Sequence, residues 1–360
     1  MPNVARVAFP LAAFATSRFV GLVAAYAVRF VLPGTGLGYV LTRWDASWYL
    51  IIAEYGYPRN PPQGASSLGF FPLYPLMTRG VEAVTGLGFK TSAVAVNMVA
   101  GAVAAVLVWR LARDVFDSDT ADRAALLFCF FPGSYSLILA YSEGVFLAFS
   151  AGCLLLLHHR HFWWAALVGG IGSASRPTGY VLAVTCAAAV FLHWRETRDW
   201  KPLPSAPLAA GGLIVYFTFL HFHTGDAFSW QRAHEQGWDQ RLALDGSMLD
   251  RVLDFFLSPQ NALIIMLPVF TTVALVPLVW NLVRVRPPAT WLVFVGAGLP
   301  ASLFATSVSF TPRHLLALFP LVVAVAHAVR GVAFTLLLAT SAGLFAFLVI
   351  VIGGTNAFTP

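Results

Sequence analysis

The sequence contains few charged residues for its length. Only 11% of its 360 residues are Asp, Glu, Lys or Arg, whereas 58% are hydrophobic. Soluble proteins are usually about one-quarter charged, so this composition excludes a soluble protein of two or three domains. The high apolar content also excludes a disordered chain. A polytopic membrane protein remains, and we expect a single membrane-embedded domain over residues 1–360.

Cysteine is also scarce, and no nucleic-acid motif is present. Cys129, Cys153 and Cys186 lie apart in apolar runs, which predicts neither a disulfide framework nor a metal site. The formal charge is +6, but no basic cluster interleaved with aromatic residues indicates a nucleic-acid surface. The basic residues are spread through the loops. We therefore expect membrane lipids, and no nucleic acid, among the partners.

Apolar runs long enough for membrane helices recur along the whole chain. A span needs about 20 mostly apolar residues, which gives about eleven spans here, within a range of roughly 9 to 12. They are expected near residues 7–31, 91–111, 124–140, 143–157, 162–175, 177–193, 206–222, 260–281, 289–308, 313–329 and 331–353. Pro132 and Pro177 could break the short spans into re-entrant helices. The expected fold class is an all-α polytopic membrane protein.

The basic residues of short loops predict the orientation. With the N-terminus inside, short inner segments hold residues such as Arg110, Arg160 and Arg284, as the positive-inside rule requires. We expect a multi-pass protein of the plasma membrane with a cytoplasmic N-terminus. Two long polar segments, 32–90 and 223–259, then form extracytoplasmic loops, and we expect the active site there.

The first of these loops contains the clearest local pattern. Residues 43–58 alternate apolar and aromatic side chains with a few polar ones, which predicts an interfacial helix that ends at Gly56. Asp45 falls in its first turn, where the helix dipole favours a carboxylate. Tyr49 shares the face of Asp45, whereas Glu54 is expected on the opposite side. From spacing alone, Asp45 either caps the helix or faces a cavity.

The second loop contains a shorter pattern of the same kind. His234 and Trp238 share a helical face, with Arg241 beside them. This pattern predicts either a lid over an acceptor or an interfacial helix, and the sequence does not decide between them.

Two motifs resemble metal sites at first sight. Asp117-Ser118-Asp119 and His158-His159-Arg160-His161 both fall on the inner side of the expected topology. We interpret the first as a solvated turn and the second as a basic turn.

Four sequence blocks follow one another along the chain. They are Arg43-Trp44-Asp45 with Trp48-Tyr49 and Phe70-Phe71-Pro72-Leu73-Tyr74-Pro75, then Tyr141-Ser142-Glu143, then Ser175-Arg176-Pro177-Thr178-Gly179, and finally Pro312-Arg313-His314. Together they resemble the PIG-V family of integral-membrane mannosyltransferases, which add the second mannose of GPI anchors in eukaryotes and have bacterial relatives. We expect a bacterial member. His314 departs from the family pattern, which has an aromatic residue at that position.

The resemblance implies a fold, a donor and a place for the reaction. The family belongs to the GT-C class of glycosyltransferases, so the expected fold is GT-C-like. The implied donor is a polyprenyl-phosphate-linked sugar, and the implied sugar is mannose. An acid in the first outer loop is expected at the active site, with transfer on the extracytoplasmic face. Asp45 occupies the position that matches this acid.

Glycosyl transfer to a hydroxyl group needs a base that takes the proton of the acceptor, and a carboxylate can do this. We assign Asp45 as the general base and Glu143 as a residue that orients or binds the acceptor. Tyr49 and His314 complete the expected substrate-binding set. The acceptor itself is a hydroxyl group of a lipid, a glycan or a protein.

The departing lipid phosphate needs a cation, and arginine suits phosphate through bidentate, charge-assisted hydrogen bonds. We assign Arg313 and Arg176 to this phosphate, with Arg43 as a further candidate. The alternative for each arginine is snorkelling at the membrane surface. Arginine alone suffices for a lipid phosphate, so we expect no cofactor, and the sequence leaves a metal requirement open.

Other functions also fit a membrane composition. A transporter or lipid-sugar flippase is one, and a non-catalytic subunit of a larger assembly is another. Transporters usually contain repeated halves with broken helices at corresponding positions. The sequence contains no convincing repeat, and its polar residues gather at one membrane face. It therefore favours an inverting mannosyltransferase, a hexosyltransferase of the GT-C type.

Overall fold

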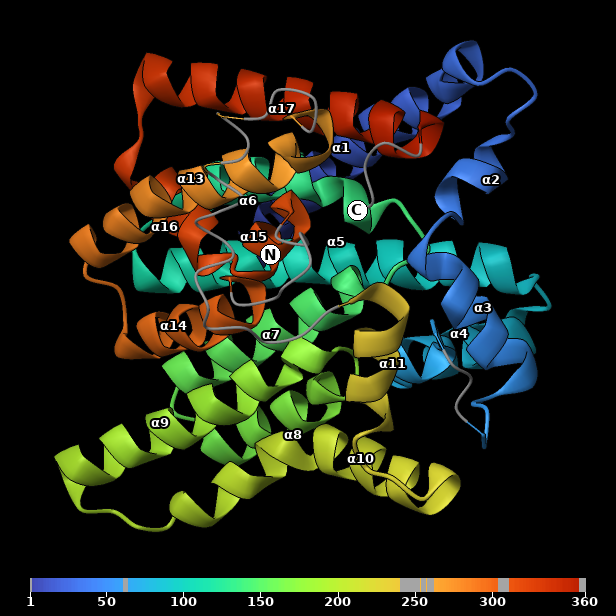
Figure 1. Ribbon diagram of the computed structural model, residues 1–360. Helices are drawn as coiled ribbons and strands as arrows, with labels where there is room; N and C mark the ends of the chain where they lie inside the picture. Colours follow the sequence, from blue (N-terminus) through green and yellow to red (C-terminus); the bar gives the residue numbers. More distant parts are fainter. Residues whose placement is uncertain are drawn as a thin grey trace.

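The chain folds into a bundle of helices, without any strand in the part that the structure describes (Figure 1). The computed structural model describes residues 2–60, 64–239, 262–303 and 311–355, together with Leu253 and Leu257. The predicted all-α fold class is confirmed.

Long helices alternate with short helical turns. The first part of the chain contains α1 (Pro2–Val31), α2 (Leu37–Leu41), α3 (Asp45–Tyr55), η1 (Ser67–Gly69), α4 (Leu73–Thr85), α5 (Phe89–Val115), α6 (Ser118–Phe130), η2 (Pro132–Leu137), α7 (Glu143–His158) and α8 (Phe162–Ser173). The second part contains η3 (Pro177–Gly179), α9 (Tyr180–Thr197), η4 (Leu203–Ala210), α10 (Gly211–Thr224), α11 (Ser229–Trp238), α13 (Ala262–Arg284), α14 (Ala289–Leu303), α15 (Pro312–Ala317), α16 (Pro320–Ala328) and α17 (Gly331–Gly354).

Several helices have the length and composition of membrane spans. In the described ranges, six helical segments are long and apolar enough to cross a membrane. They are Val7–Val31, Phe89–Val115, Pro177–Thr197, Leu203–Thr224, Met266–Arg284 and Gly331–Gly354, and three shorter apolar helices accompany them. Exposed side chains such as Phe30, Phe222 and Trp280 give the bundle an apolar outer surface. A multi-pass membrane protein is confirmed, and the count of eleven spans stays a prediction.

Two predicted spans are not single helices, and one of the breaks occurs at Pro132, where the sequence allowed it. The span at 124–140 ends as an α-helix at Phe130 and continues as the 3-10 turn η2, because Pro132 lacks an N–H and clashes with the preceding helical turn. The span at 313–329 is divided into α15 and α16, and Pro320 begins the second of these. Both interruptions place polar chain segments inside the bundle.

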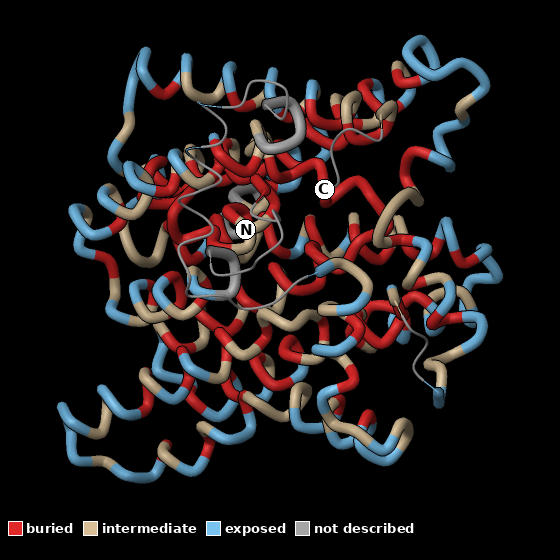
Figure 2. Tube along the Cα trace, in the orientation of Figure 1, coloured by how far each residue is buried: buried red, intermediate tan, exposed pale blue. Residues whose placement is uncertain are grey.

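The centre of the bundle is built around α5, which packs against α1, α4, α6 and α7. Small side chains on α5, including Gly101, Ala104 and Ala105, allow neighbouring backbones to approach closely. On α7, a Cβ atom at Gly144 would overlap the backbone carbonyl oxygen of Asn97. Figure 2 shows the buried residues concentrated along these inner helices, with exposed residues on the outer helices and links.

The charged side chain of Arg18 lies buried in the middle of α1 and stabilises the end of α6. Its Nη1 donates to the carbonyl oxygen of Ser134 at 2.8 Å, and its Nη2 donates to that of Cys129 at 2.8 Å. The rings of Phe14 and Phe345 lie 4.8 and 5.3 Å from its guanidinium carbon. A helix leaves its last carbonyl groups without partners, so Arg18 supplies donors where the α6–η2 break removes them.

Asn97 of α5 likewise pairs backbone groups, here in the segment that leads into α7. Its Nδ2 donates to the carbonyl oxygens of Ser136 and Leu139 at 2.8 and 2.7 Å, and its Oδ1 accepts from the N–H of Gly144 at 2.7 Å. This buried side chain therefore fixes the start of α7.

We predict that Asn97→Ala lowers the free energy of unfolding by about 3 kcal/mol or more, because it leaves two buried carbonyl oxygens and one buried N–H unpaired. Thermal unfolding of the purified chain in detergent measures this loss. Thr335→Ala on the exposed side of α17 serves as the control and is expected to unfold like the wild type. An Asn97→Ala chain as stable as that control would contradict the role assigned to Asn97.

Candidate functional site

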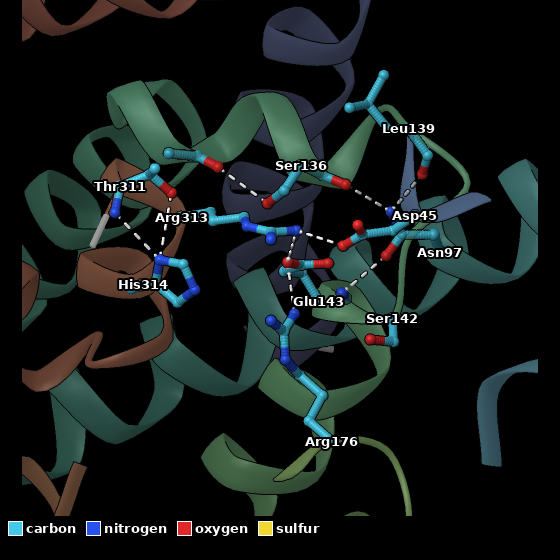
Figure 3. Close-up of polar contacts among 12 residues, drawn as sticks. Asp45, Asn97, Ser136, Leu139, Ser142, Glu143, Arg176, Thr311, Arg313 and His314 are labelled. Carbon is cyan, nitrogen blue, oxygen red and sulfur yellow. Dashed lines mark hydrogen bonds and ion pairs between the residues drawn. The ribbon is translucent and has the colours of Figure 1, made fainter. Parts of the chain in front are cut away.

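Four of the predicted site residues form one cluster of ion pairs (Figure 3). Arg313 Nη1 lies 2.8 Å from Asp45 Oδ2 and 3.1 Å from Glu143 Oε1. Arg176 Nη1 forms an ion pair with the same oxygen of Glu143. The four side chains come from the start of α3, the first turn of α7, the turn before η3 and the first turn of α15. Segments far apart in the sequence thus meet at one site.

The members of this ion cluster differ in their exposure. The side chains of Glu143, Arg313 and Arg176 are 3%, 10% and 15% exposed, whereas that of Asp45 is 28% exposed. Buried charges are tolerated when they are paired and hydrogen-bonded. Two acids and two arginines give the cluster a formal charge of zero. Asp45 is therefore the member most accessible to an incoming molecule.

The backbone around Asp45 is held in an unusual conformation. Trp44 precedes α3 with a φ of 58°, in the left-handed region that side chains other than glycine rarely adopt. The helix ends at Gly56, as predicted. The buried face of α3 includes Tyr49, and Glu54 on the other side is exposed, as the spacing predicts. Location of this helix in the membrane interface stays a prediction.

Arg43 lies next to this strained turn and binds the end of α17. Its Nη1 donates to the carbonyl oxygen of Gly353 at 2.5 Å, and Trp44 Nε1 donates to that of Ile352 at 3.2 Å. The Arg43 guanidinium also packs over the Tyr39 and Trp44 rings. These contacts fix the start of α3 to α17, and a phosphate-binding role for Arg43 stays a prediction.

Tyr49 lies beneath the ion cluster as a link between α3 and α7. Its hydroxyl donates to Ser142 Oγ at 2.8 Å, directly before Glu143. The Phe70 and Tyr74 rings contact its ring edge to face, with centroids 5.3 and 4.8 Å away. Burial raises the pKa of the Tyr49 phenol above its ordinary value, so the hydroxyl stays protonated. Its substrate-binding role stays a prediction.

His314 takes part in the cap of α15. Its Nδ1 accepts a hydrogen bond from the N–H of Thr311 at 3.1 Å and lies 3.2 Å from the Thr311 hydroxyl. The imidazole also lines a small cavity with Arg176 and Thr178. Apolar side chains form the rest of its wall, namely Phe146, Val181, Phe294, Ala317 and Leu318.

A group of half-buried aromatic residues lies beside α3. Trp48 stacks on Phe70 with ring centroids 5.8 Å apart, and Trp238 of α11 packs edge-on against both rings. His234 lies 3.1 Å from the carbonyl oxygen of Gly69. Helix α11 thus covers η1, which agrees with the shared face predicted for His234 and Trp238. Arg241 and Asp245 of the same predicted loop lie outside the described residues.

The other charged motifs of the sequence have structural roles. Asp117 caps α6 by accepting the N–H of Thr120 at 2.7 Å, and this hydrogen bond lowers the pKa of the Asp117 carboxyl. His159 lies 3.0 Å from Asp114. Among the described residues, no three His, Cys, Asp or Glu side chains form a group able to hold a metal ion. The three cysteines are free and buried.

Several residues of the site were not singled out from the sequence. Tyr141 and Thr178 lie within the motifs that predicted Glu143 and Arg176, so these motifs could have identified them. Tyr135 lies in the η2 turn with no motif around it, and only the fold brings it near Arg313.

Comparisons with known proteins find relatives of parts of this chain. The family model described as "Dolichyl-phosphate-mannose-protein mannosyltransferase" matches residues 69–222, which include Glu143 and Arg176. GPI mannosyltransferase 2 of Drosophila pseudoobscura pseudoobscura is 35% identical over 126 residues, which cover 32% of this chain and 26% of that protein. GPI alpha-1,6-mannosyltransferase 2 of Mus musculus is 30% identical over 204 residues, which cover 51% of this chain and 39% of that protein.

Solved structures share the fold at low sequence identity. The apo structure of ArnT from Cupriavidus metallidurans has a TM-score of 0.52 and 14% identity, covering 88% of this chain and 60% of that one. An oligosaccharyltransferase of Archaeoglobus fulgidus has a TM-score of 0.52 and 17% identity, covering 94% of this chain and 53% of that one. The archaeal AglB from Archaeoglobus fulgidus, solved with an inhibitory peptide and a dolichol-phosphate, has a TM-score of 0.50 and 14% identity and covers 95% of this chain and 56% of that one.

These findings confirm two expectations from the sequence. The chain resembles the PIG-V mannosyltransferases, and its fold is GT-C-like. The matched stretches span between about a quarter and two fifths of the length of the curated relatives.

We predict that Glu143→Gln destabilises the fold strongly. The change removes the acid that Arg176 and Arg313 share, and breaking a buried ion pair typically costs about 3–5 kcal/mol. Thermal unfolding in detergent measures the loss. The control is Glu196→Gln, because Glu196 and its partner Arg160 are both more than half exposed, and such a pair contributes about 1 kcal/mol at most. Equal melting temperatures for the two variants would contradict the shared-acid role.

Proposed function

We propose that this chain transfers mannose from a polyprenyl-phosphate-linked donor to a hydroxyl group, with inversion, on the extracytoplasmic face of the plasma membrane. The observation that carries this proposal is the ion cluster, in which Asp45 is the most exposed of two acids and two arginines. In this proposal Asp45 acts as the carboxylate base, and the neighbouring Arg313 and Arg176 bind the donor phosphate. The acceptor is a hydroxyl group of a lipid, a glycan or a protein.

The reaction is a single displacement at the anomeric carbon of the sugar. The acceptor oxygen attacks this carbon, and Asp45 takes the proton of the acceptor hydroxyl. As the new C–O bond forms, the bond from the anomeric carbon to the phosphate oxygen breaks, and the lipid phosphate leaves with the electron pair. Attack from the side opposite the leaving group inverts the anomeric configuration.

The contacts of Asp45 divide its two oxygen atoms between two tasks. Arg313 donates to Oδ2 and so fixes the orientation of the carboxylate. Oδ1 is the atom that we assign to the acceptor proton. Glu143 is too buried for an acceptor hydroxyl to reach its carboxylate, and both arginines bind it. We assign to Glu143 the positioning of Arg176 and Arg313.

The electrostatics of the site favour a lipid-phosphate donor. A phosphodiester carries one negative charge and enters a cluster whose formal charge is zero. Once the sugar is transferred, the lipid phosphate gains negative charge, and guanidinium groups stabilise it more strongly. The small cavity beside Arg176, Thr178 and His314 is lined otherwise mainly by apolar side chains, and we propose that the lipid part of the donor leaves the phosphate on this side. An isoprenoid chain leaving the phosphate in that direction would meet an apolar wall.

Several comparisons support the same donor class. The relatives are named mannosyltransferases, and the matching family model is described by a dolichyl-phosphate-mannose donor. AglB, which shares the fold, was solved with a dolichol-phosphate. A transporter or flippase without transferase activity is not favoured, because the relatives with detectable sequence identity are named as transferases.

We predict that Asp45→Asn reduces sugar transfer by about 100-fold or more, since a general base contributes about 10²–10⁴ to the rate. Transfer is measured with radiolabelled polyprenyl-phosphate-mannose and a membrane-lipid extract as the acceptor source. Donor binding, followed as a shift of the melting temperature, is expected to persist, because the variant removes a negative charge from the phosphate site. The matched control is Glu54→Gln on the exposed face of the same helix.

Equal transfer by wild type and Asp45→Asn would remove Asp45 from the mechanism. Donor binding by a wild type that transfers no sugar into any acceptor extract would overturn the transferase proposal itself.

A further inference from the structure

Two buried tyrosine hydroxyls near Arg313 lack hydrogen-bond partners. Tyr135 and Tyr141 are 1% and 0% exposed. Within the described parts of the chain, neither hydroxyl forms a hydrogen bond, although the Thr311 side chain lies close to that of Tyr135, and Nε of Arg313 is also unpaired. A buried donor without a partner costs free energy, so most native buried donors are paired. Three such donors around one guanidinium therefore require a physical reason.

The fold pairs other buried tyrosines without difficulty. The hydroxyl of Tyr49 donates to Ser142 Oγ, and that of Tyr74 donates to the carbonyl oxygen of Ala93 at 2.8 Å. The hydroxyl of Tyr216 donates to the carbonyl oxygen of Leu68 at 2.7 Å. Other buried side chains, such as Ser150, Trp230 and Trp291, also contain an unpaired polar atom. Among the buried tyrosines of the described chain, the unpaired hydroxyls are those of Tyr135 and Tyr141. Tyr135 and Tyr141 instead share their position next to the ion cluster.

Packing fixes both tyrosines relative to Arg313. The guanidinium carbon of Arg313 lies over the Tyr141 ring, 5.4 Å from its centroid. Tyr135 belongs to η2, whose backbone abuts the first turn of α15 so closely that a Cβ atom at Gly133 would overlap the carbonyl group of Pro312.

The hydrogen bonds of Arg313 do not use its Nε, which is buried and unpaired among the described residues. Its Nη1 carries both ion pairs, to Asp45 and to Glu143. A guanidinium has a second edge, formed by Nε and Nη2, which matches two oxygen atoms of a phosphate. Arg313 can therefore keep Asp45 oriented while its Nε edge binds an anion. The Tyr141 ring packs against this guanidinium, and the hydroxyls of Tyr135 and Tyr141 are further unpaired donors in the same buried region.

We infer that Tyr135, Tyr141 and the Nε–H of Arg313 bind the phosphate oxygens of the lipid-linked donor. This inference rests on the proposed function and deepens it, because it adds two substrate-binding residues to the same site. The leaving phosphate gains charge as its bond to the sugar breaks. Preorganised donors in a water-excluded site stabilise such developing charge, so the hydroxyls act on both donor binding and turnover.

The test uses Tyr135→Phe, Tyr141→Phe and the double variant in the full-length chain. Each change removes only a hydroxyl that has no partner in the described structure, so melting temperatures without ligand are expected to stay equal to wild type or to rise. Transfer efficiency is expected to fall by about tenfold or more per hydroxyl, since loss of one oxyanion donor costs up to about 10²–10³. Sugar-free polyprenyl phosphate should raise the melting temperature of the wild type, and this rise should be absent in the double variant.

The control is Tyr216→Phe, which removes an equally buried hydroxyl that has a partner. Its melting temperature is expected to fall while its transfer efficiency stays close to wild type. Inorganic phosphate is added in a parallel arm. If both ligands raise the melting temperature of the wild type and neither raises that of the double variant, the result supports a site for the phosphate group. If only polyprenyl phosphate does so, the result supports a site for the lipid ester.

Three results would overturn the inference. The first is a double variant with wild-type transfer, which means that ordered water satisfies the hydroxyls. The second is lost transfer with an unchanged shift by polyprenyl phosphate. The third is a double variant whose melting temperature without ligand is lower than that of the wild type, because hydroxyls with a purely structural role would stabilise the fold. A wild type that transfers no sugar, but shows the tyrosine-dependent shift, would instead overturn the proposed function and support the phosphate site.

Discussion

The guanidinium group of Arg313 joins two carboxylates that the chain brings from separate helices. Without this group, Asp45 and Glu143 would be two like charges at the same buried place, and the fold would not tolerate them. Arg176 completes the balance from a fourth segment. The mutual arrangement of α3, α7 and α15 thus depends on one shared cation. Every other feature of the site either holds this cation in place or leaves one of its edges open.

Broken helices create the space for this arrangement, and buried polar side chains make the breaks possible. The interruption at Pro132 exposes carbonyl groups that Arg18 and Asn97 pair, from two different helices. His314 and Thr311 cap α15 beside Arg313. In an apolar surrounding, unpaired backbone groups are costly. The side chains that pair these backbone groups therefore have to be polar even though they are buried. Their role does not require contact with a substrate.

Local patterns predicted much of the fold and of the candidate site. The spacing of Asp45 and Tyr49 and the end of their helix at Gly56 follow from helical geometry alone, and the structure confirms both. The break before Pro320 went unnoticed because the apolar run continues across it. The contact of Arg43 with α17 joins residues near opposite ends of the chain, which no local pattern contains. Tyr135 was missed for the same reason.

The difference in exposure between the two acids separates their roles. Both are carboxylates within hydrogen-bond distance of the same nitrogen atom, so chemistry alone does not distinguish them. Glu143 is enclosed and binds two arginines, which makes it a fixed counter-charge. Asp45 is bound by one of them and is the more exposed acid. A base must exchange a proton with an arriving molecule, whereas a counter-charge must not. In the reaction that we propose, the fold satisfies both demands because Glu143 is buried, whereas Asp45 lies at the start of a helix and is the more exposed acid.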